Sequence, residues 1–261
     1  MRVGFLQFYP KLFHEKQNLD KISLMLQNCN TDLVVLPELC TSGYSFKSKA
    51  EMEPLSSADS GRIPDFFKHI AEREETALVA GFLEKDGELF YNSQILVDPF
   101  GNQTIYRKTH LFLNEKDIFA PGNTGFKVVK YKNAFLGLMV CFDWIFPESA
   151  RTLSIMGADI LCHSANLVMP FCQKAMITRS IENHVYTITG NRIGSEKNRD
   201  QALTFTGMSQ ITDPQGNILV KADQTEEVLM SVDIDPEIAR NKMITEKNHL
   251  FEDRRKEFYD L

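Results

Sequence analysis

The feature that most constrains the fold is a repeated alternation of short apolar runs with longer amphipathic segments. Runs rich in Val, Ile, Leu and Phe are typical of strands that are buried on both faces, and the segments between them have the spacing of helices that cover a sheet. We therefore predict a layered α/β architecture. The predicted strands are residues 2–8, 33–36, 77–83, 93–97, 104–107, 135–141, 159–163, 186–191, 204–212 and 228–234. The predicted helices are residues 14–28, 64–75, 147–156 and 173–184.

Turn sequences between the predicted strands indicate how those strands connect. The segments DG at 86–87, PFGN at 99–102 and DPQG at 213–216 have the residues that tight turns require. They predict antiparallel hairpins mixed with βα units, and hence two packed sheets rather than one parallel sheet. The chain has no fixed-period repeat, low-complexity tract or Ser/Gly linker. We expect a single domain over residues 1–261, with a polar C-terminal tail from about residue 245.

Charge and cysteine content restrict the partners and the cellular setting. The 29 Lys and Arg residues are outnumbered by 35 Asp and Glu residues, and the net charge of −6 predicts a small-molecule partner rather than nucleic acid. No apolar run approaches the roughly 20 residues that cross a bilayer, and the N-terminus lacks the pattern of a signal peptide. The five cysteines are odd in number and scattered. We expect a cytoplasmic protein with reduced thiols and no membrane partner.

Three reactive side chains each follow an apolar strand. Glu38 comes after LVVLP, Lys108 after TIYR, and Cys141 after FLGLMV. The ligands of α/β sheets bind beyond the carboxyl ends of the strands, so side chains at these ends can converge from distant parts of the chain. Each residue alone has a plainer interpretation, as a solvated charge or a small buried thiol.

The segment after Cys141 strengthens its candidacy as a nucleophile. Pro147 and Glu148 resemble the start of a helix, and a sharp connection from strand to helix would expose the thiol. A nearby cation such as Lys108 would favour the thiolate and could later hold an oxyanion. Glu38 would then act as the general base.

Histidine provides an alternative base and an alternative ligand. Of the six histidines, His110 and His163 lie at plausible strand ends, but we favour Glu38 as the base. His110 is expected to be a structural polar residue beside Lys108, and His163 to end the strand ADILCH. Cys162, His163 and Cys172 lack the paired spacing of a zinc site, so we expect no metal.

A set of segments now identifies a family resemblance over nearly the whole chain. In order, these segments are VGFLQF, DLVVLPELCTSGY around Glu38, YRKTHLF around Lys108, EKDIFAPG, LGLMVCFDWIFPESAR around Cys141, HSANL, RSIENHVYTITGNRIG and DRRKEF. Taken together, they resemble the nitrilase superfamily of carbon–nitrogen hydrolases. The resemblance implies an αββα two-sheet sandwich that pairs into a homodimer or a higher homo-oligomer. It also implies an enzyme without a metal or an organic cofactor.

The resemblance further implies the roles of the site residues. Glu38, Lys108 and Cys141 correspond to a Glu-Lys-Cys triad, and Glu115, which would otherwise be interpreted as a surface acid, corresponds to a second glutamate that orients Lys108 or the substrate. Cys141 would attack the substrate carbonyl while Lys108 and the Phe142 backbone N–H hold the oxyanion. Ammonia would leave, and hydrolysis of the thioester would release a carboxylic acid.

The substrate class is expected to be a small amide. The segment CFDWIFPE resembles the C-x-D-x-x-F-P-E form of the amidase and carbamoyl-hydrolase branches. A nitrilase or an N-carbamoyl amidohydrolase with the same triad is the alternative. Candidate pocket walls are Tyr44, Phe112, Phe142, Trp144 and Asn166, although such aromatic residues more often serve core packing.

Two hypotheses of other classes remain. A catalytically silent binding protein could use this fold, because fold does not dictate function, but the reactive positions are intact. A thiol redox protein built on Cys141 is less favoured, because Cys162 is predicted to lie on a different strand and cannot serve as a neighbouring resolving thiol.

Overall fold

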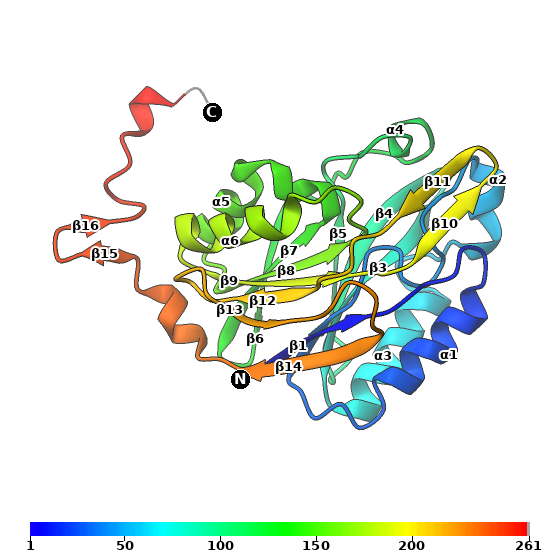
Figure 1. Ribbon diagram of the computed structural model, residues 1–261, viewed down its shortest axis with the longest axis horizontal. Helices are drawn as coiled ribbons and strands as arrows, with labels where there is room; N and C mark the ends of the chain where they lie inside the picture. The colour runs from blue at the N-terminus through cyan, green and yellow to red at the C-terminus, as the bar shows by residue number, and fades with distance from the viewer. Residues whose placement is uncertain (260–261) are drawn as a thin grey trace.

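The computed structural model of the protein describes residues 1–259. Two six-stranded sheets pack face to face at its centre. Helices α1 (Glu15–Met25) and α3 (Arg62–Glu74) cover the outer face of the first sheet, and α5 (Pro147–Ile155) and α6 (Cys172–Asn183) cover that of the second (Figure 1). This arrangement confirms the predicted αββα sandwich.

The first sheet has the strand order β14-β1-β2-β3-β4-β5. Its central strands β1, β2 and β3 run parallel, whereas β14, β4 and β5 pair antiparallel with their neighbours. The turns at 86–87 and 99–102 therefore form the hairpins predicted from the sequence. The strands are β1 (Arg2–Gln7), β2 (Leu33–Val35), β3 (Ala77–Asp86), β4 (Leu89–Val97), β5 (Gln103–Arg107) and β14 (Val228–Asp233).

The second sheet repeats this plan with the order β13-β12-β9-β8-β7-β6. Strands β7, β8 and β9 are parallel, and antiparallel strands flank them on both sides. Each sheet thus places the carboxyl ends of three parallel strands at one edge. The strands are β6 (Lys127–Tyr131), β7 (Ala134–Val140), β8 (Ile160–Ala165), β9 (Tyr186–Asn191), β12 (Gln210–Thr212) and β13 (Ile218–Lys221).

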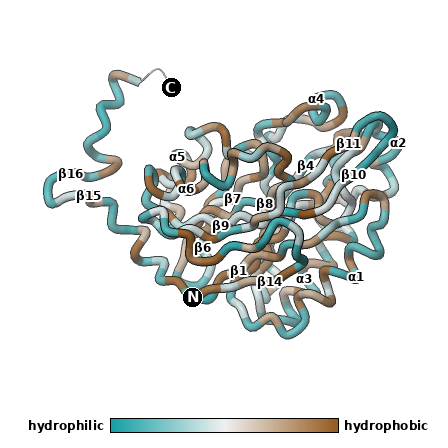
Figure 2. The backbone as a smooth tube through the Cα atoms, viewed as in Figure 1, coloured by the Kyte–Doolittle hydropathy of each residue, from teal (hydrophilic) through white to brown (hydrophobic). Residues whose placement is uncertain are grey.

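Hydrophobic burial explains why the sheets pack. The strands are the most hydrophobic part of the chain, and hydrophilic residues gather on the outer helices and the C-terminal segment (Figure 2). The core between the sheets includes Val35 and Val79 from the first sheet and Leu136 and Leu138 from the second. Because these side chains leave water only when both sheets are present, burial couples the two halves of the chain.

Shorter elements complete the chain. They are α2 (Lys49–Met52), η1 (Glu53–Leu55), α4 (Glu115–Ile118), η2 (Cys141–Ile145), β10 (Ser195–Asn198), β11 (Gln201–Thr204), η3 (Pro236–Arg240), β15 (Met243–Thr245), β16 (Asn248–His249) and η4 (Lys256–Phe258). Strands β10 and β11 form a hairpin, as do β15 and β16. The segment after η3 runs out from the body and carries the β15–β16 hairpin (Figure 1).

Several strand predictions are wrong in their extent. Strands β3 and β4 are longer than the predicted residues 77–83 and 93–97, because their hairpin pairs as far as Asp86 and Leu89. The strand predicted for 204–212 is interrupted between β11 and β12, because Gly207 and Met208 have φ angles of 56° and 54°. Two consecutive left-handed residues cannot continue an extended strand. The strand predicted to end at His163 continues to Ala165, since its pairing with β9 extends that far.

Candidate active site

The three predicted catalytic residues, Glu38, Lys108 and Cys141, each lie just beyond the end of a strand. Glu38 follows β2, Lys108 directly follows β5, and Cys141 directly follows β7. All three residues are buried, with exposed fractions of 0%, 1% and 5%. The charges of Glu38 and Lys108 act on the Cys141 thiol, so the folded chain brings together side chains from distant parts of the sequence.

Lys108 bridges two carboxylates inside the protein. Its Nζ donates to Glu38 Oε1 at 2.7 Å and to Glu115 Oε1 at 2.8 Å. Glu115 lies at the start of α4, where its other oxygen accepts from the Phe112 backbone N–H at 2.8 Å. The surface position that composition alone assigns to Glu115 is therefore wrong, because this carboxylate is buried against a lysine.

Asn92 is a further member of this cluster that sequence reasoning missed. Its Nδ2 donates to Glu38 Oε1 at 2.6 Å and more weakly to Glu115 Oε1 at 3.3 Å. The backbone carbonyl oxygen of Asn92 accepts from the Lys108 backbone N–H at 2.9 Å, so Asn92 holds both Glu38 and Lys108. The run NSQ inside the buried strand β4 is the sequence signal, because three polar residues in a core need partners.

Burial and mutual charge set the protonation of the cluster. Burial raises the pKa of Glu38, and Lys108 opposes this effect. Burial alone would lower the pKa of Lys108, but the neighbouring Glu115 and Glu38 carboxylates reverse that and raise it, so Lys108 carries its charge. Glu38 Oε2 has no hydrogen-bond partner in the described part of the chain. This oxygen therefore has an unused capacity to accept a hydrogen bond or a proton.

Cys141 lies at a strained connection between strand and helix. Its φ angle is 40°, in the left-handed region that non-glycine residues seldom adopt. The turn η2 begins at Cys141, and α5 begins at Pro147, as predicted. Strain of this kind persists where surrounding contacts hold it, and it is frequent at functional sites.

Two expectations about the Cys141 thiol are wrong. The connection does not expose the thiol, because Cys141 is 5% exposed. Burial, followed by the Glu38 carboxylate, raises the pKa of Cys141 well above its ordinary value, although Lys108 lowers it in part. The resting form is therefore the thiol, and its proton must be removed when it reacts.

The two candidate histidines support the backbone of the site. His163 Nε2 lies 3.0 Å from the Cys141 carbonyl oxygen, and its Nδ1 lies 3.2 Å from Thr189 Oγ1. His110 Nδ1 lies 2.7 Å from Asp143 Oδ1, which agrees with a structural role. Burial lowers the pKa of His163 to about 4, so the ring is neutral at pH 7.

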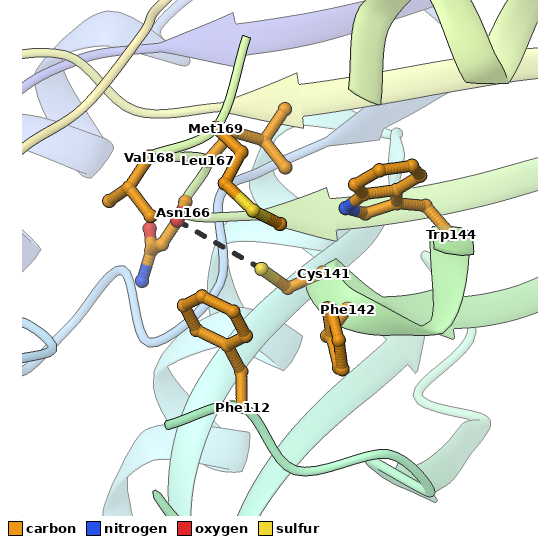
Figure 3. A pocket seen from close by; sticks show the side chains of 8 residues that line it. All are labelled: Phe112, Cys141, Phe142, Trp144, Asn166, Leu167, Val168 and Met169. Atoms are coloured by element: carbon orange, nitrogen blue, oxygen red, sulfur yellow. Dashed lines mark hydrogen bonds between the residues drawn. The ribbon is translucent and has the colours of Figure 1, made fainter. Parts of the chain in front are cut away.

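A small pocket opens at Cys141 Sγ (Figure 3). It encloses about 240 Å³ of space, its mouth included. Cys141 Sγ faces the backbone carbonyl of Asn166 at 3.9 Å. The lining residues are Phe112, Cys141, Phe142, Trp144, Asn166, Leu167, Val168 and Met169.

Two further predicted site groups are the Tyr44 side chain and the Phe142 backbone N–H. Tyr44 lines a second pocket together with Glu115, and burial and the Glu115 carboxylate raise the pKa of its phenol well above the ordinary value. Phe142 follows Cys141 at the start of η2, where the first N–H groups of a helix have no partner within it.

Residues 1–259 contain neither a metal-binding cluster nor a membrane-spanning helix. Within this range, no group of three or more His, Cys, Asp or Glu side chains is arranged to hold a metal ion. None of the helices described in the same range is long and apolar enough to span a bilayer.

Comparisons with known proteins agree with this geometry. The carbon-nitrogen hydrolase family profile matches residues 2–242. A protein named nitrilase from Pyrococcus abyssi is 41% identical over 99% of both chains, and a citrullinase from Francisella tularensis is 30% identical over 95% of this chain and 93% of that one. The crystal structure of a carbon-nitrogen hydrolase from Helicobacter pylori superposes with a TM-score of 0.84 at 26% identity, covering 99% of this chain and 97% of the other.

Proposed function

The chain belongs to the carbon-nitrogen hydrolase family and is a hydrolase of carbon–nitrogen bonds. From this premise, we propose that it hydrolyses a small amide through a thioester on Cys141. The observation that carries the proposal is the fully buried Lys108, which is hydrogen-bonded to Glu38 and Glu115 beside a buried thiol. Because burying charged groups costs stability, such a cluster favours a catalytic explanation over a structural one.

In the first proposed step, Glu38 removes the Cys141 proton through Oε2, its free oxygen. The thiol sulfur forms a bond to the substrate carbonyl carbon, and the electron pair of the carbonyl π bond moves to oxygen. Lys108 and the Phe142 N–H stabilise this oxyanion. The raised pKa of Glu38 makes it a stronger base than an exposed glutamate, which suits a thiol whose own pKa is raised.

In the second step, the oxyanion collapses and the carbon–nitrogen bond breaks. Glu38 returns its proton to the leaving nitrogen, and ammonia departs from a thioester on Cys141. Water then loses a proton to Glu38 and attacks the thioester carbon. The carbon–sulfur bond breaks, the thiol regains its proton, and the carboxylic acid is released.

Nitrile hydrolysis is the second candidate function. The Pyrococcus abyssi relative is named nitrilase, whereas the relatives from Pseudomonas and Arabidopsis are named (R)-stereoselective amidase and N-carbamoylputrescine amidase. The segment CFDWIFPE after β7 resembles the amidase and carbamoyl-hydrolase branches, so we place amides first.

Ammonia release and intact-protein mass provide the test. The wild type should release ammonia from short amides faster than from matched nitriles or N-carbamoyl compounds, and it should show a transient acyl adduct. Cys141→Ala should lose both signals, while Cys29→Ala, which removes a buried thiol at the opposite end of the first sheet, should keep them. Wild-type ammonia release by Cys141→Ala would refute the covalent mechanism. Amide binding without turnover or adduct would support the silent binding protein.

We also propose that the enzyme forms a homodimer through the α5–α6 face. Ile155, Met156 and Ile181 are each 49% exposed there. A second copy of the chain would remove these large apolar side chains of the two covering helices from water. Ile155→Glu should shift the sedimentation of the protein toward the monomer at micromolar concentration, and a wild type that sediments as a monomer would refute the proposal.

A further inference from the structure

None of the eight side chains that line the Cys141 pocket carries a formal charge in its resting form. Six are apolar or aromatic, and the remaining two are the Cys141 thiol and the Asn166 carboxamide. Figure 3 shows Cys141 Sγ between the Trp144 ring on one side and Asn166 on the other. The part of a substrate that extends beyond the reacting carbonyl therefore meets rings, aliphatic groups and one amide.

From this lining we infer that the substrate's acyl part is uncharged and carries a neutral hydrogen-bonding group that Asn166 recognises. The inference rests on the proposed amide hydrolysis and narrows its substrate class. A pocket of this kind uses many apolar contacts for affinity and a few polar groups for orientation.

Asn166 has the properties of a ligand-binding group. It is 3% exposed, and neither Oδ1 nor Nδ2 has a hydrogen-bond partner among residues 1–259. Leaving buried polar atoms without partners is unfavourable, and one carboxamide can both donate to and accept from a neutral ligand. The adjacent Leu167 N–H donates to Asn191 Oδ1 at 3.0 Å, so the backbone that carries Asn166 is held in place.

The charges around the pocket disfavour a substrate carboxylate. The Lys108 ammonium is already shared between Glu38 and Glu115, and this trio has an excess of one negative charge. Arg179, behind Trp144, is also engaged, because its guanidinium donates to the Trp144 carbonyl oxygen at 3.2 Å and pairs with Glu182 at 2.7 Å. An anionic substituent would therefore be buried without a counter-ion, which is strongly unfavourable.

A substrate ammonium group is disfavoured for a different reason. The aromatic walls can attract a cation, but the nearby carboxylate oxygens Glu38 Oε1 and Glu115 Oε1 already accept from Lys108. A second cation beside them would be repelled by the Lys108 ammonium. An ammonium on Glu38 Oε2 would occupy the atom that we propose as the base.

Four amides of similar length test the inference. They are 4-hydroxybutyramide, pentanamide, 4-aminobutyramide and succinamate, whose far ends are a hydroxyl, a methyl, an ammonium and a carboxylate. We expect the highest kcat/KM for ammonia release with 4-hydroxybutyramide, and a value for succinamate about 100-fold lower. If either charged amide matched or exceeded 4-hydroxybutyramide, the inference would be overturned while amide hydrolysis stood. Ammonia release from none of the four, without an acyl adduct, would overturn the proposed function itself.

Variants of Asn166 test its recognition role. Asn166→Leu keeps the size of the side chain and should lower the ratio of kcat/KM for 4-hydroxybutyramide over pentanamide by about tenfold, the effect of one lost hydrogen bond. Asn166→Asp should shift preference toward 4-aminobutyramide. The controls Asn30→Leu and Asn30→Asp change an exposed asparagine before β2 and should leave both ratios unchanged. Melting temperatures verify folding, and an unchanged ratio in folded Asn166→Leu would refute the assignment.

Discussion

The Nζ atom of Lys108 lies 2.7 Å from Oε1 of Glu38, and both side chains are fully buried. Glu115 accepts from the same ammonium on its other side. Removing one partner of a buried ion pair typically costs about 3–5 kcal/mol, because the remaining charges lose their counter-ion. We expect Lys108→Met to lower the free energy of unfolding by about that amount and to abolish ammonia release.

Urea denaturation at pH 7 measures this loss against a surface control. Lys85 pairs with Glu53 where both side chains remain in contact with water. Lys85→Met should therefore cost no more than about 1 kcal/mol. If the two variants unfolded at the same urea concentration, the energetic importance assigned to the buried lysine would be wrong.

A second prediction concerns Asn92, which donates to Glu38 Oε1 at 2.6 Å. This hydrogen bond lowers the pKa of Glu38 and partly offsets the effect of burial. Glu38 must be ionised to act as a base, so the activity of the wild type should fall as the pH drops through the raised pKa of Glu38. Asn92→Leu removes the hydrogen bond and should move this acidic limb to higher pH.

The dependence of kcat/KM on pH shows whether Asn92 acts on Glu38 or only supports the fold. We also expect kcat to fall by about 10- to 100-fold, the effect of losing one hydrogen bond to a charged group. Asn30→Leu should reproduce the wild-type profile. An Asn92→Leu enzyme with lower activity but an unmoved acidic limb would show that Asn92 does not tune Glu38.

Much of the fold and part of the site were predictable because they depend on local patterns. Apolar runs and turn residues indicated the central strands, since a strand buried on both faces must be apolar along its length. Strand ends indicated Glu38, Lys108 and Cys141. Family resemblance was needed to assign Glu115, because nothing in the charged run NEKD indicates that one of its acids is buried.

The missed features depend on contacts between distant residues. The NSQ run of β4 marks polar residues in a core, but only the folded sheet shows that Asn92 contacts Glu38. The break near Gly207 depends on two left-handed residues, and β6 has half-buried edge residues that weaken its apolar pattern. The raised thiol pKa follows from total burial of Cys141, which a strand-end position does not specify.

A third prediction uses the buried ring of His163. Its Nε2 lies beside the Cys141 carbonyl oxygen and must donate, so the neutral ring accepts at Nδ1. Burial lowers its pKa from 6.5 to about 4. Between these pH values the unfolded chain therefore binds a proton on this ring that the folded chain does not bind. Stability should rise with pH across this window, and about 3 kcal/mol should be lost as the pH falls from 6.5 to 4.

Replacing His163 by glutamine tests this pH dependence directly. His163→Gln keeps a donor for the Cys141 carbonyl oxygen but cannot titrate. Urea unfolding between pH 4.5 and 7.5 should show a slope of stability with pH that is smaller in this variant than in the wild type. An equal slope in the two proteins would mean that other groups cause the pH dependence.

The last prediction concerns a buried ion pair beside the site. Arg192 pairs with Glu196, and both residues are almost entirely buried. The guanidinium also donates to the Pro10 carbonyl oxygen at 2.6 Å and lies 4.0 Å from the centre of the Phe205 ring. Glu196 in turn accepts from the Tyr44 backbone N–H at 3.1 Å, so the pair anchors the segment that lines the pocket beside Glu115.

Arg192→Met should lower the free energy of unfolding by about 3–5 kcal/mol, because it leaves the Glu196 carboxylate buried without its counter-ion. Arg192→Lys should recover little of the lost stability, since an ammonium cannot stack on a ring as a planar group or donate several hydrogen bonds in the fixed geometry of a guanidinium. Adding Glu196→Gln to Arg192→Met removes the stranded charge while keeping an acceptor for the Tyr44 N–H. The double variant should therefore be more stable than Arg192→Met alone, with a coupling energy of about 1–3 kcal/mol in a double-mutant cycle measured by urea unfolding. Additive effects of the two substitutions would mean that Arg192 stabilises the fold through its contacts with Pro10 and Phe205 rather than through its charge.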